Sequence, residues 1–245
     1  MAMNILVTGI SGRMGQAVKQ AVELNPDTQV SATHDVGQDI DAALAAADTA
    51  IDFSFHGFTP ELLRAAVAQR KPLVIGTTGH TDEEKAAIVE ASQSIPIVFA
   101  SNYSVGVNTL FWLTRKATRI LQGYDIEIIE MHHHHKLDAP SGTARTLAEI
   151  ACEETGLDPK QDVMHGREGL VGARPQRQIG MHSLRGGDVV GDHTVIYATE
   201  GERVELTHKA SNRMTFAGGA VRAALWLAQQ PAGLYNMQDV LGFTD

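Results

Sequence analysis

The amino-acid sequence predicts an α/β protein: a parallel sheet with helices on both faces, followed by an α+β domain with a mixed, open sheet. Short continuous apolar runs alternate with helical patterns through the first hundred residues. Such runs are typical of parallel strands that are buried on both faces of a sheet. Beyond about residue 103, several strand-like stretches follow one another, which is the pattern of an α+β domain.

The first part is expected to contain five strands joined by helices. The predicted strands are 5–7, 30–33, 50–53, 73–75 and 97–100. The predicted helices are 14–24, 40–47, 60–70 with Pro60 at its first position, and one that Thr81 caps. Each strand is followed by a small, polar or glycine-rich loop. Because ligands of parallel α/β sheets bind at the carboxyl ends of the strands, these loops predict a ligand-binding edge.

The second part is expected to mix helices with a series of strands. The predicted elements are a helix over 107–121, a strand over 125–130, a helix over 141–154 and strands over 176–184, 189–199 and 202–208. The last two strands form a predicted hairpin around Gly201. A final Ala-rich helix is predicted over 216–229.

Composition and charge exclude several classes of protein. The chain has 245 residues, of which 43% are hydrophobic, and 29 acidic side chains outnumber 20 basic ones. An acidic chain without a basic run is a poor ligand for nucleic acid or an anionic membrane. The uncharged stretch 91–114 contains Pro96 and Asn102, which argue against a membrane span. One cysteine, Cys152, permits no internal disulfide. With no recognisable signal peptide, we expect a cytoplasmic protein.

A glycine-rich turn predicts a dinucleotide site and a Rossmann-like first domain. Gly9, Gly12 and Gly15 lie between a strand and a helix, and Asp35 follows the next strand. Glycines let the backbone approach a pyrophosphate, the helix N-terminus attracts its charge, and the carboxylate binds ribose hydroxyls. The alternative is an ordinary glycine-rich surface turn, since the spacing is G-x-x-G-x-x-G.

The residues around Asp35 favour NADH over NADPH. A carboxylate repels the ribose 2′-phosphate of NADPH, and the next residue, Val36, cannot pair with that phosphate. Arg13, within the turn, is the one candidate cation for a 2′-phosphate.

The segment 130–144 carries four consecutive histidines and then the predicted start of a helix. Successive side chains of a strand point to opposite faces, so the four imidazoles do not converge on one ion, and we expect no metal. Histidine and lysine suit proton transfer instead. Free N–H groups at the helix start form a carboxylate site, so we expect a small dicarboxylate ligand. The alternative is that the histidines are solvated and Ser141 only caps the helix.

Five stretches together resemble the dihydrodipicolinate reductase family, also called 4-hydroxy-tetrahydrodipicolinate reductases. They are 7–15, 76–79, 102–108, 132–144 and 209–216. The resemblance implies an oxidoreductase of lysine and diaminopimelate biosynthesis. Such an enzyme uses NADH or NADPH to reduce 4-hydroxy-tetrahydrodipicolinate to tetrahydrodipicolinate and water. It also implies a cofactor domain of residues 1–103 and 215–245, a substrate-binding and tetramerisation domain of residues 104–214, and a homotetramer.

The resemblance also implies a role for individual residues. His132 and Lys136 match the proton donors. The substrate contacts match His133, Gly142 and Thr143. The cofactor contacts match Gly9, Ile10, Ser11, Gly12, Arg13, Met14, Asp35, Gly76, Thr77, Thr78, Ala100, Ser101, Asn102 and Tyr103. This chain departs from many members at Val36, where they carry a basic residue.

Three other functions compete with this reading. A short-chain dehydrogenase needs a tyrosine four residues before a lysine, and none of the four tyrosines has one. A non-enzymatic NAD sensor would need the glycine-rich turn but neither His132 nor Lys136. A metal hydrolase would lose its activity on chelation.

Overall fold

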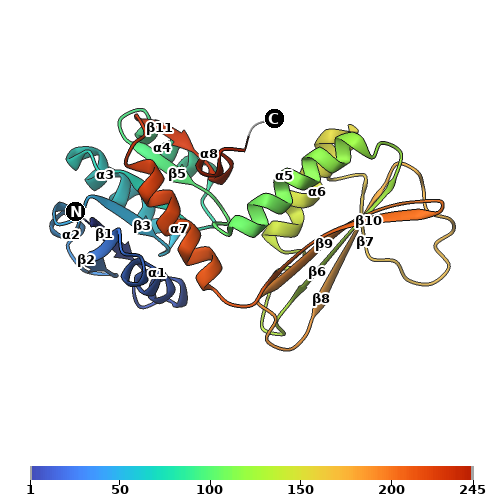
Figure 1. Ribbon diagram of the computed structural model, residues 1–245, viewed down its shortest axis with the longest axis horizontal. Coiled ribbons are helices and arrows are strands. Elements are labelled where there is room, and N and C mark those ends of the chain that lie inside the picture. The colour runs from blue at the N-terminus through green and yellow to red at the C-terminus, as the bar shows by residue number, and fades with distance from the viewer. Residues whose placement is uncertain (1, 244–245) are drawn as a thin grey trace. The chain divides into compact units, whose positions relative to one another are not determined.

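The computed structural model describes residues 2–243, which form two compact units (Figure 1). The first unit comprises the chain up to Val105 and again from Arg213, and the second comprises Gly106–Asn212. The boundaries of these units lie two residues from the domain boundaries expected from the sequence, which followed residues 103 and 214. The expected fold class, a Rossmann-like parallel sheet plus a second domain with a mixed sheet, is confirmed.

The first unit is built on a six-stranded sheet of order β11-β5-β4-β3-β1-β2, in which every pair is parallel. The strands are β1 (Met3–Thr8), β2 (Thr28–His34), β3 (Thr49–Asp52), β4 (Leu73–Ile75), β5 (Pro96–Phe99) and β11 (Gly233–Tyr235). The chain runs from β1 to β2 on one side of β1 and then returns to β3 on its other side. The strand order therefore reverses between β1 and β3, which is where sheets of this kind bind ligands.

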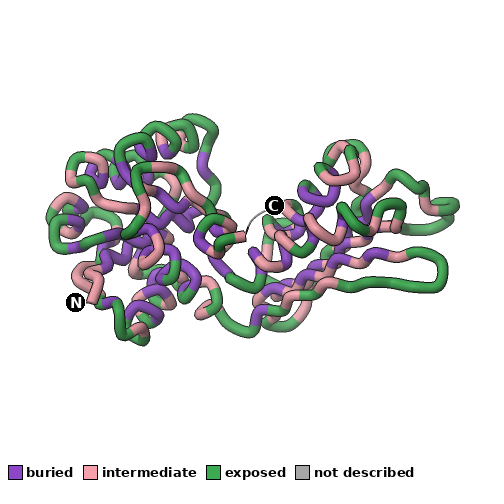
Figure 2. Tube along the Cα trace, turned by 45° about the horizontal axis from the view of Figure 1, so that its top comes forward, coloured by how far each residue is buried: buried purple, intermediate pink, exposed green. Residues whose placement is uncertain are grey.

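Helices cover both faces of this sheet because each central strand is apolar on both sides. They are α1 (Arg13–Leu24), α2 (Ile40–Ala45), α3 (Thr59–Gln69), α4 (Asp82–Ser92), α7 (Met214–Leu227) and α8 (Met237–Leu241), with a short 3₁₀ turn η1 (His56–Phe58). Ile5 and Val7 of β1 pack in one core with α1 and α7, whereas Leu6 packs in a second core with α2, α3 and α4. Figure 2 shows the buried segments along these strands.

Local sequence signals explain where the helices of this unit begin. The Thr81 hydroxyl accepts from the Glu84 N–H, and the Glu84 carboxylate accepts from the Thr81 N–H, so the expected cap of α4 is confirmed. Pro60 lies one position further into α3 than expected, because the helix begins at Thr59. In both cases a residue suited to a first turn fixes the start of the helix.

The second unit contains a five-stranded mixed sheet of order β10-β9-β6-β8-β7. The strands are β6 (Asp125–His132), β7 (Val163–His165), β8 (Ile179–Arg185), β9 (Gly191–Thr199) and β10 (Glu202–Ala210). β8 is parallel to β6 and β7, whereas β9 is antiparallel to β6 and β10. Gly201 has a φ of +90° between β9 and β10, which confirms the predicted hairpin.

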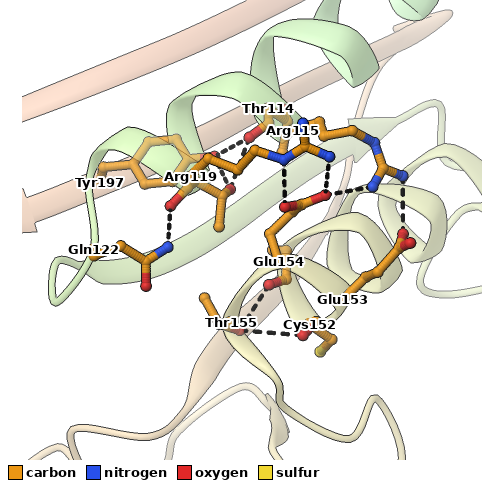
Figure 3. A network of polar contacts seen from close by, with 11 residues as sticks. Thr114, Arg115, Arg119, Gln122, Cys152, Glu153, Glu154, Thr155 and Tyr197 are labelled. Carbon is orange, nitrogen blue, oxygen red and sulfur yellow. Dashed lines mark hydrogen bonds and ion pairs between the residues drawn. The ribbon is translucent and has the colours of Figure 1, made fainter. Parts of the chain in front are cut away.

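Two helices, α5 (Val105–Ile120) and α6 (Gly142–Thr155), cover one face of this sheet. Ionic contacts join the two helices: Arg115 and Arg119 of α5 both bind the Glu154 carboxylate of α6, with N–O distances of 2.5 and 2.6 Å (Figure 3). Tyr197 of β9 donates its hydroxyl to the Thr114 carbonyl of α5 at 3.1 Å. The opposite face of the sheet, which includes Ile129, has no helix of the second unit over it.

None of the helices within residues 2–243 combines the length and the apolar character that a membrane span needs. The uncharged stretch 91–114 consists of the end of α4, strand β5, a loop and the first turns of α5.

Candidate active site

The glycine-rich turn lies at the point where the strand order of the first sheet reverses. Gly9 follows β1 with a φ of +69°, and a Cβ there would collide with the carbonyl of Phe53, which follows β3. A Cβ on Gly15 would collide with the carbonyl of Gly9. Side chains are therefore excluded where β1, β3 and α1 come closest, which leaves the turn as bare backbone.

The start of α1 suits a pyrophosphate. Gly12 is the N-cap of α1 and provides no side chain to cap it, and the first turn has no acidic residue. The first N–H groups of a helix and its dipole attract an anion. Ile10 and Ser11 form the loop before this N-terminus, and Arg13 and Met14 begin the helix. The predicted cofactor residues from Gly9 to Met14 therefore form one continuous turn.

Asp35 lies beside this turn and holds part of it. Its Oδ2 accepts from the backbone N–H of Ser11 at 2.9 Å, and its Oδ1 accepts from the N–H of Val36 at 3.0 Å. Hydrogen bonding to Ser11 lowers the pKa of Asp35 below its ordinary value. The group is thus an ionised acceptor at neutral pH, as binding of ribose hydroxyls requires.

A pocket of about 600 Å³ opens beside Asp35 and includes Gly9, Ser11 and the aromatic ring of Phe55. This volume is typical of a cofactor or small-molecule site. Its lining contains two carboxylates, Asp35 and Glu61, and neither lysine nor arginine. Arg13 lines a different pocket along α1, with Lys19 and Arg213.

The loops after β4 and β5 meet the same edge of the sheet. Thr78 and Ser101 are exposed there, whereas Gly76 is buried and a Cβ on it would collide with the Phe53 ring. Tyr103 is buried, and its hydroxyl donates to the carbonyls of Ile75 and Val98 at 2.9 and 3.0 Å. Its side chain therefore anchors the loop after β5 to strands β4 and β5. Ala100 and Asn102 are half-buried between these residues.

A buried carboxylate, Asp52, joins the ends of three strands at this edge. It accepts hydrogen bonds of 2.5 Å from the hydroxyls of Thr8, Ser54 and Thr77. Thr8 ends β1, Asp52 ends β3, and Thr77 follows β4. The hydroxyl of Thr77, a predicted cofactor residue, is thus already engaged as a donor. Sequence analysis missed the role of Asp52, which depends on contacts between distant segments.

In the second unit, His132 ends strand β6 and pairs with a buried carboxylate. Its Nδ1 lies 2.5 Å from Oε2 of Glu130, which is fully buried two residues earlier on the same face. Arg185 binds both oxygens of Glu130 at 2.9 Å. Burial lowers the pKa of His132, and the Glu130 carboxylate opposes that shift. His132 is therefore a titratable group near the predicted substrate residues.

A second imidazole, His193 of β9, lies beside His132 with 5.2 Å between ring centroids. Its Nε2 is 3.0 Å from the hydroxyl of Ser141, which also accepts from the Ala144 N–H as the N-cap of α6. Burial lowers the pKa of His193 to about 3, so the ring is neutral at physiological pH. His193 therefore supports the N-terminus of α6, at which Gly142 and Thr143 are the first two residues.

The loop between β6 and α6 holds the other predicted residues. Lys136 lies in a turn closed by its N–H and the His133 carbonyl at 3.1 Å, and its Nζ is 2.7 Å from Asp138. The rings of His134 and His135 lie 3.9 Å apart between centroids and are tilted by 52°. The expected alternation of four histidines along a strand is wrong, because β6 ends at His132 and the next three residues turn.

Among the residues from 2 to 243, no group of three or more His, Cys, Asp or Glu side chains is arranged to hold a metal ion.

Sequence analysis also missed Glu130, Arg185 and His193. The i, i+2 spacing of Glu130 and His132 on a strand was a usable signal, since it puts both side chains on one face. Arg185 and His193 reach the site only through the pairing of β8 and β9 with β6.

Comparison with known proteins identifies one family along nearly the whole chain. Residues 3–103 match the family model described as dihydrodipicolinate reductase, N-terminus, and residues 106–241 match its C-terminus. A 4-hydroxy-tetrahydrodipicolinate reductase of Akkermansia muciniphila is 68% identical over 243 residues, with 99% of each chain covered. The enzyme of the same name from Chromobacterium violaceum is 49% identical, also with 99% of each covered.

A solved structure, dipicolinate-bound dihydrodipicolinate reductase from Paenisporosarcina sp. TG-14, has the same fold. The TM-score is 0.78 at 24% identity, with 98% of this chain and 99% of that one covered. A probable dehydrogenase from Thermotoga maritima shares the fold more distantly, with a TM-score of 0.63 at 10% identity and coverage of 97% and 92%. The resemblance seen in the sequence is confirmed, and the chain belongs to the dihydrodipicolinate reductase family.

Proposed function

We propose that the chain catalyses the NAD(P)H-dependent reduction of 4-hydroxy-tetrahydrodipicolinate to tetrahydrodipicolinate and water, in lysine and diaminopimelate biosynthesis. Family membership over the whole length supports this reaction. The observation that carries it is the combination in the second unit of a carboxylate-bound imidazole, His132, a nearby ammonium, Lys136, and the N-terminus of α6.

The first unit is proposed to bind the cofactor. The turn from Gly9 to Met14 would hold the pyrophosphate, and Asp35 the adenine ribose. The segments Gly76–Thr78 and Ala100–Tyr103 would line the nicotinamide end, where Asp52 and Tyr103 fix the loops. When bound, NAD(P)H supplies the hydride. We further propose that NADH is preferred, because Asp35 and Glu61 both repel a 2′-phosphate and no lysine or arginine lines their pocket.

The second unit is proposed to bind the dicarboxylate substrate. Gly142 and Thr143 offer N–H groups at the start of α6, and His133 lies on the loop leading there. A proton from an N–H bond of His132 or Lys136 would combine with the departing 4-hydroxyl group to give water. The hydride would form the new C–H bond. A non-enzymatic NAD sensor would need neither the proposed proton donors nor the proposed anion site.

The expected homotetramer is also a proposal. One face of the second unit's sheet has no helix of that unit over it, and Ile129, Met131 and Ile196 on it are only partly buried in the single chain. A second copy covering this face would remove apolar surface from water. Light scattering should give four times the chain mass of 26.4 kDa. The cytoplasmic location expected from the sequence stays a prediction.

The experiment follows the oxidation of NADH by its absorbance at 340 nm. The substrate is freshly made by the synthase that catalyses the preceding step of the pathway. We expect Lys136→Ala to lower kcat by about 10²–10⁴-fold, the usual worth of general acid help, with an unchanged Kd for NADH. Lys160→Ala, an exposed lysine of the same unit, is the matched control and should keep full activity. EDTA should leave the rate intact. A Lys136→Ala enzyme with normal turnover would remove the assigned role.

A further inference from the structure

We propose that Glu130, clamped by Arg185, is the positioning residue of this site. It holds the His132 ring with its proton on Nδ1, so that Nε2 is the atom that exchanges a proton with the substrate. This inference rests on the proposed function for the role of His132. It concerns two side chains, Glu130 and Arg185, to which the resemblance assigned no role.

The ladder of the second sheet brings the three groups together. Glu130 and His132 are two residues apart on β6 and therefore share a face, the one that α6 covers. On the neighbouring strand β8, Arg185 is the register partner of His132. One carboxylate thus lies between an imidazole and a guanidinium. Its Oε2 is 2.5 Å from His132 Nδ1 and 2.9 Å from Arg185 Nη1.

The charge state of Glu130 decides which atom of His132 carries the proton. An ionised carboxylate only accepts hydrogen bonds, so the Nδ1 facing it must be the donor. Burial raises the pKa of Glu130, but hydrogen bonds from Arg185 and His132 lower it by more. The pKa of Glu130 is therefore below its ordinary value. Arg185 therefore keeps a fully buried Glu130 ionised, and Glu130 selects the Nδ1–H tautomer.

Arg185 also links this pair to the loop that holds Lys136. Its Nη2 donates to the Asp138 carbonyl at 2.7 Å, and the Asp138 carboxylate binds Lys136 at 2.7 Å. Ser141, at the end of the same loop, donates its N–H to Glu130 at 3.3 Å. The carboxylate and its arginine thus place both proposed proton donors relative to the start of α6.

The remaining nitrogen, Nε2 of His132, faces the β9 side of the ring. A Cβ on Gly191 would lie 3.0 Å from it, so glycine leaves room there. The charged or titratable groups facing His132 are Glu130 of β6, Arg185 of β8, Lys136 of the loop and His193 of β9. His193 is neutral and engaged with Ser141. Glu130 is therefore the one anion in this set, and it supports the imidazolium against two cations.

The first test is the variant Glu130→Gln, which keeps the size of the side chain and removes its charge. We expect kcat to fall about 10²–10³-fold, within the range for general acid catalysis, with little change in KM and none in the Kd for NADH. The limb of the kcat–pH profile that reports His132 should move to lower pH, because the imidazolium loses its anion. An active variant with an unchanged pH profile would overturn the proposal.

The second test needs no substrate and reads the tautomer in the wild-type protein. Long-range ¹H–¹⁵N spectra of the wild-type protein with ¹⁵N-labelled histidine report the tautomer of each ring, and His132→Gln assigns the His132 signal. We expect the proton on Nδ1 at a pH above the titration of the ring. Observation of the Nε2–H tautomer would overturn the proposal. If His132→Gln keeps full turnover while the tautomer is as expected, the proposed proton transfer by His132 fails, and only the selection of the Nδ1–H tautomer by Glu130 stands.

The matched control is Glu154→Gln. Glu154 also bridges two arginines in the second unit, but at the far end of α6 (Figure 3). Its loss should lower the thermal midpoint and leave the kcat–pH profile in place. A shift of that profile equal to the one in Glu130→Gln would show that any buried ion pair of the unit has this effect, and would contradict a specific role for Glu130.

Discussion

Asp35 and Asp52 are carboxylates at the same edge of the first sheet, yet their surroundings differ. Asp52 is fully buried and three hydroxyl groups donate to it, so it holds the strand ends together. The Asp35 carboxylate is bound by Ser11 of the turn and by the N–H of Val36, and it lines an open pocket. A carboxylate that still faces a pocket can accept hydrogen bonds from a ligand.

This difference makes Asp35→Ala the test of the cofactor preference. We expect the Kd for NADH to rise about 10–100-fold, because hydrogen bonds to a charged group are worth about 1.5–3 kcal/mol. The Kd for NADPH should rise less or fall, since the variant also removes repulsion of the 2′-phosphate. Fluorescence titration with both cofactors measures the two constants on one preparation. An equal loss for NADH and NADPH would contradict ribose-hydroxyl binding by Asp35.

Single residues were predictable where their role depends on local spacing. Asp35 was found because it follows a strand at a fixed distance from the glycines, and His132 and Lys136 because they lie in one short motif. Asp52 and Arg185 form their contacts across strands, and no spacing along the chain reveals a pairing register. The sequence thus indicates candidate ligand-binding groups better than the groups that position them.

At the scale of the element, α7 shows how a helix near the end of the chain becomes part of the first unit. It packs in one core with α1, β1, β3, β4 and β5. Gly219 lies against the carbonyl of Tyr103, so close that a Cβ would collide with it. Its neighbour Gly218 has no atom within 4 Å of such a Cβ. Two adjacent glycines of one helix therefore have opposite steric surroundings.

This contrast gives a paired prediction for stability. Gly218→Ala should raise the free energy of unfolding by about 0.5–1 kcal/mol, because alanine favours a helix more than glycine does. Gly219→Ala should lower it by about 1–3 kcal/mol, since overpacking against backbone outweighs the same gain. Urea denaturation followed by circular dichroism compares the two. If both substitutions stabilise the protein equally, the close approach of α7 to Tyr103 is not present in solution.

Elements with a strong periodic or apolar pattern were predicted, and weak ones were not. Strands β1–β5 of the first sheet and helices α5, α6 and α7 follow the predicted ranges within a few residues. β7 and β11 have three residues each and no continuous apolar run, so they exist only because a neighbouring strand pairs with them. β8 begins at Ile179 and not at Gln176, because the Gln178 carbonyl accepts from Arg174.

For the whole molecule, the division into two units was predictable from the sequence. Strands alternate with helices up to about residue 103, and several strands follow one another beyond it. The first unit buries both faces of its sheet, and the second covers one face with α5 and α6. That second unit also buries polar groups beside its core, among them Glu130, His132 and His193. Titratable groups thus lie where they influence the stability of the fold.

Buried imidazoles make the folded state sensitive to acid. Burial lowers the pKa of His80, His132, His193 and His208. His193 shows the largest effect, with a pKa of about 3 in the folded protein against 6.5 in the unfolded chain. The unfolded chain therefore binds this proton first, and the free energy of unfolding falls as the pH drops from about 7 towards 3.

We expect the loss of stability between pH 7 and pH 5 to be about 2 kcal/mol smaller in His193→Gln than in the wild-type protein. At pH 5 the unfolded imidazole is protonated and the folded one is not, and each unit of pH in that range is worth about 1.4 kcal/mol. Glutamine can still donate to the Ser141 hydroxyl, so the cap of α6 is kept. Urea denaturation at both pH values gives the four free energies. His165→Gln, which replaces an exposed histidine of β7, should change the pH dependence little. An equal pH dependence in wild type and His193→Gln would mean that His193 accepts its proton in the folded state as readily as in the unfolded one.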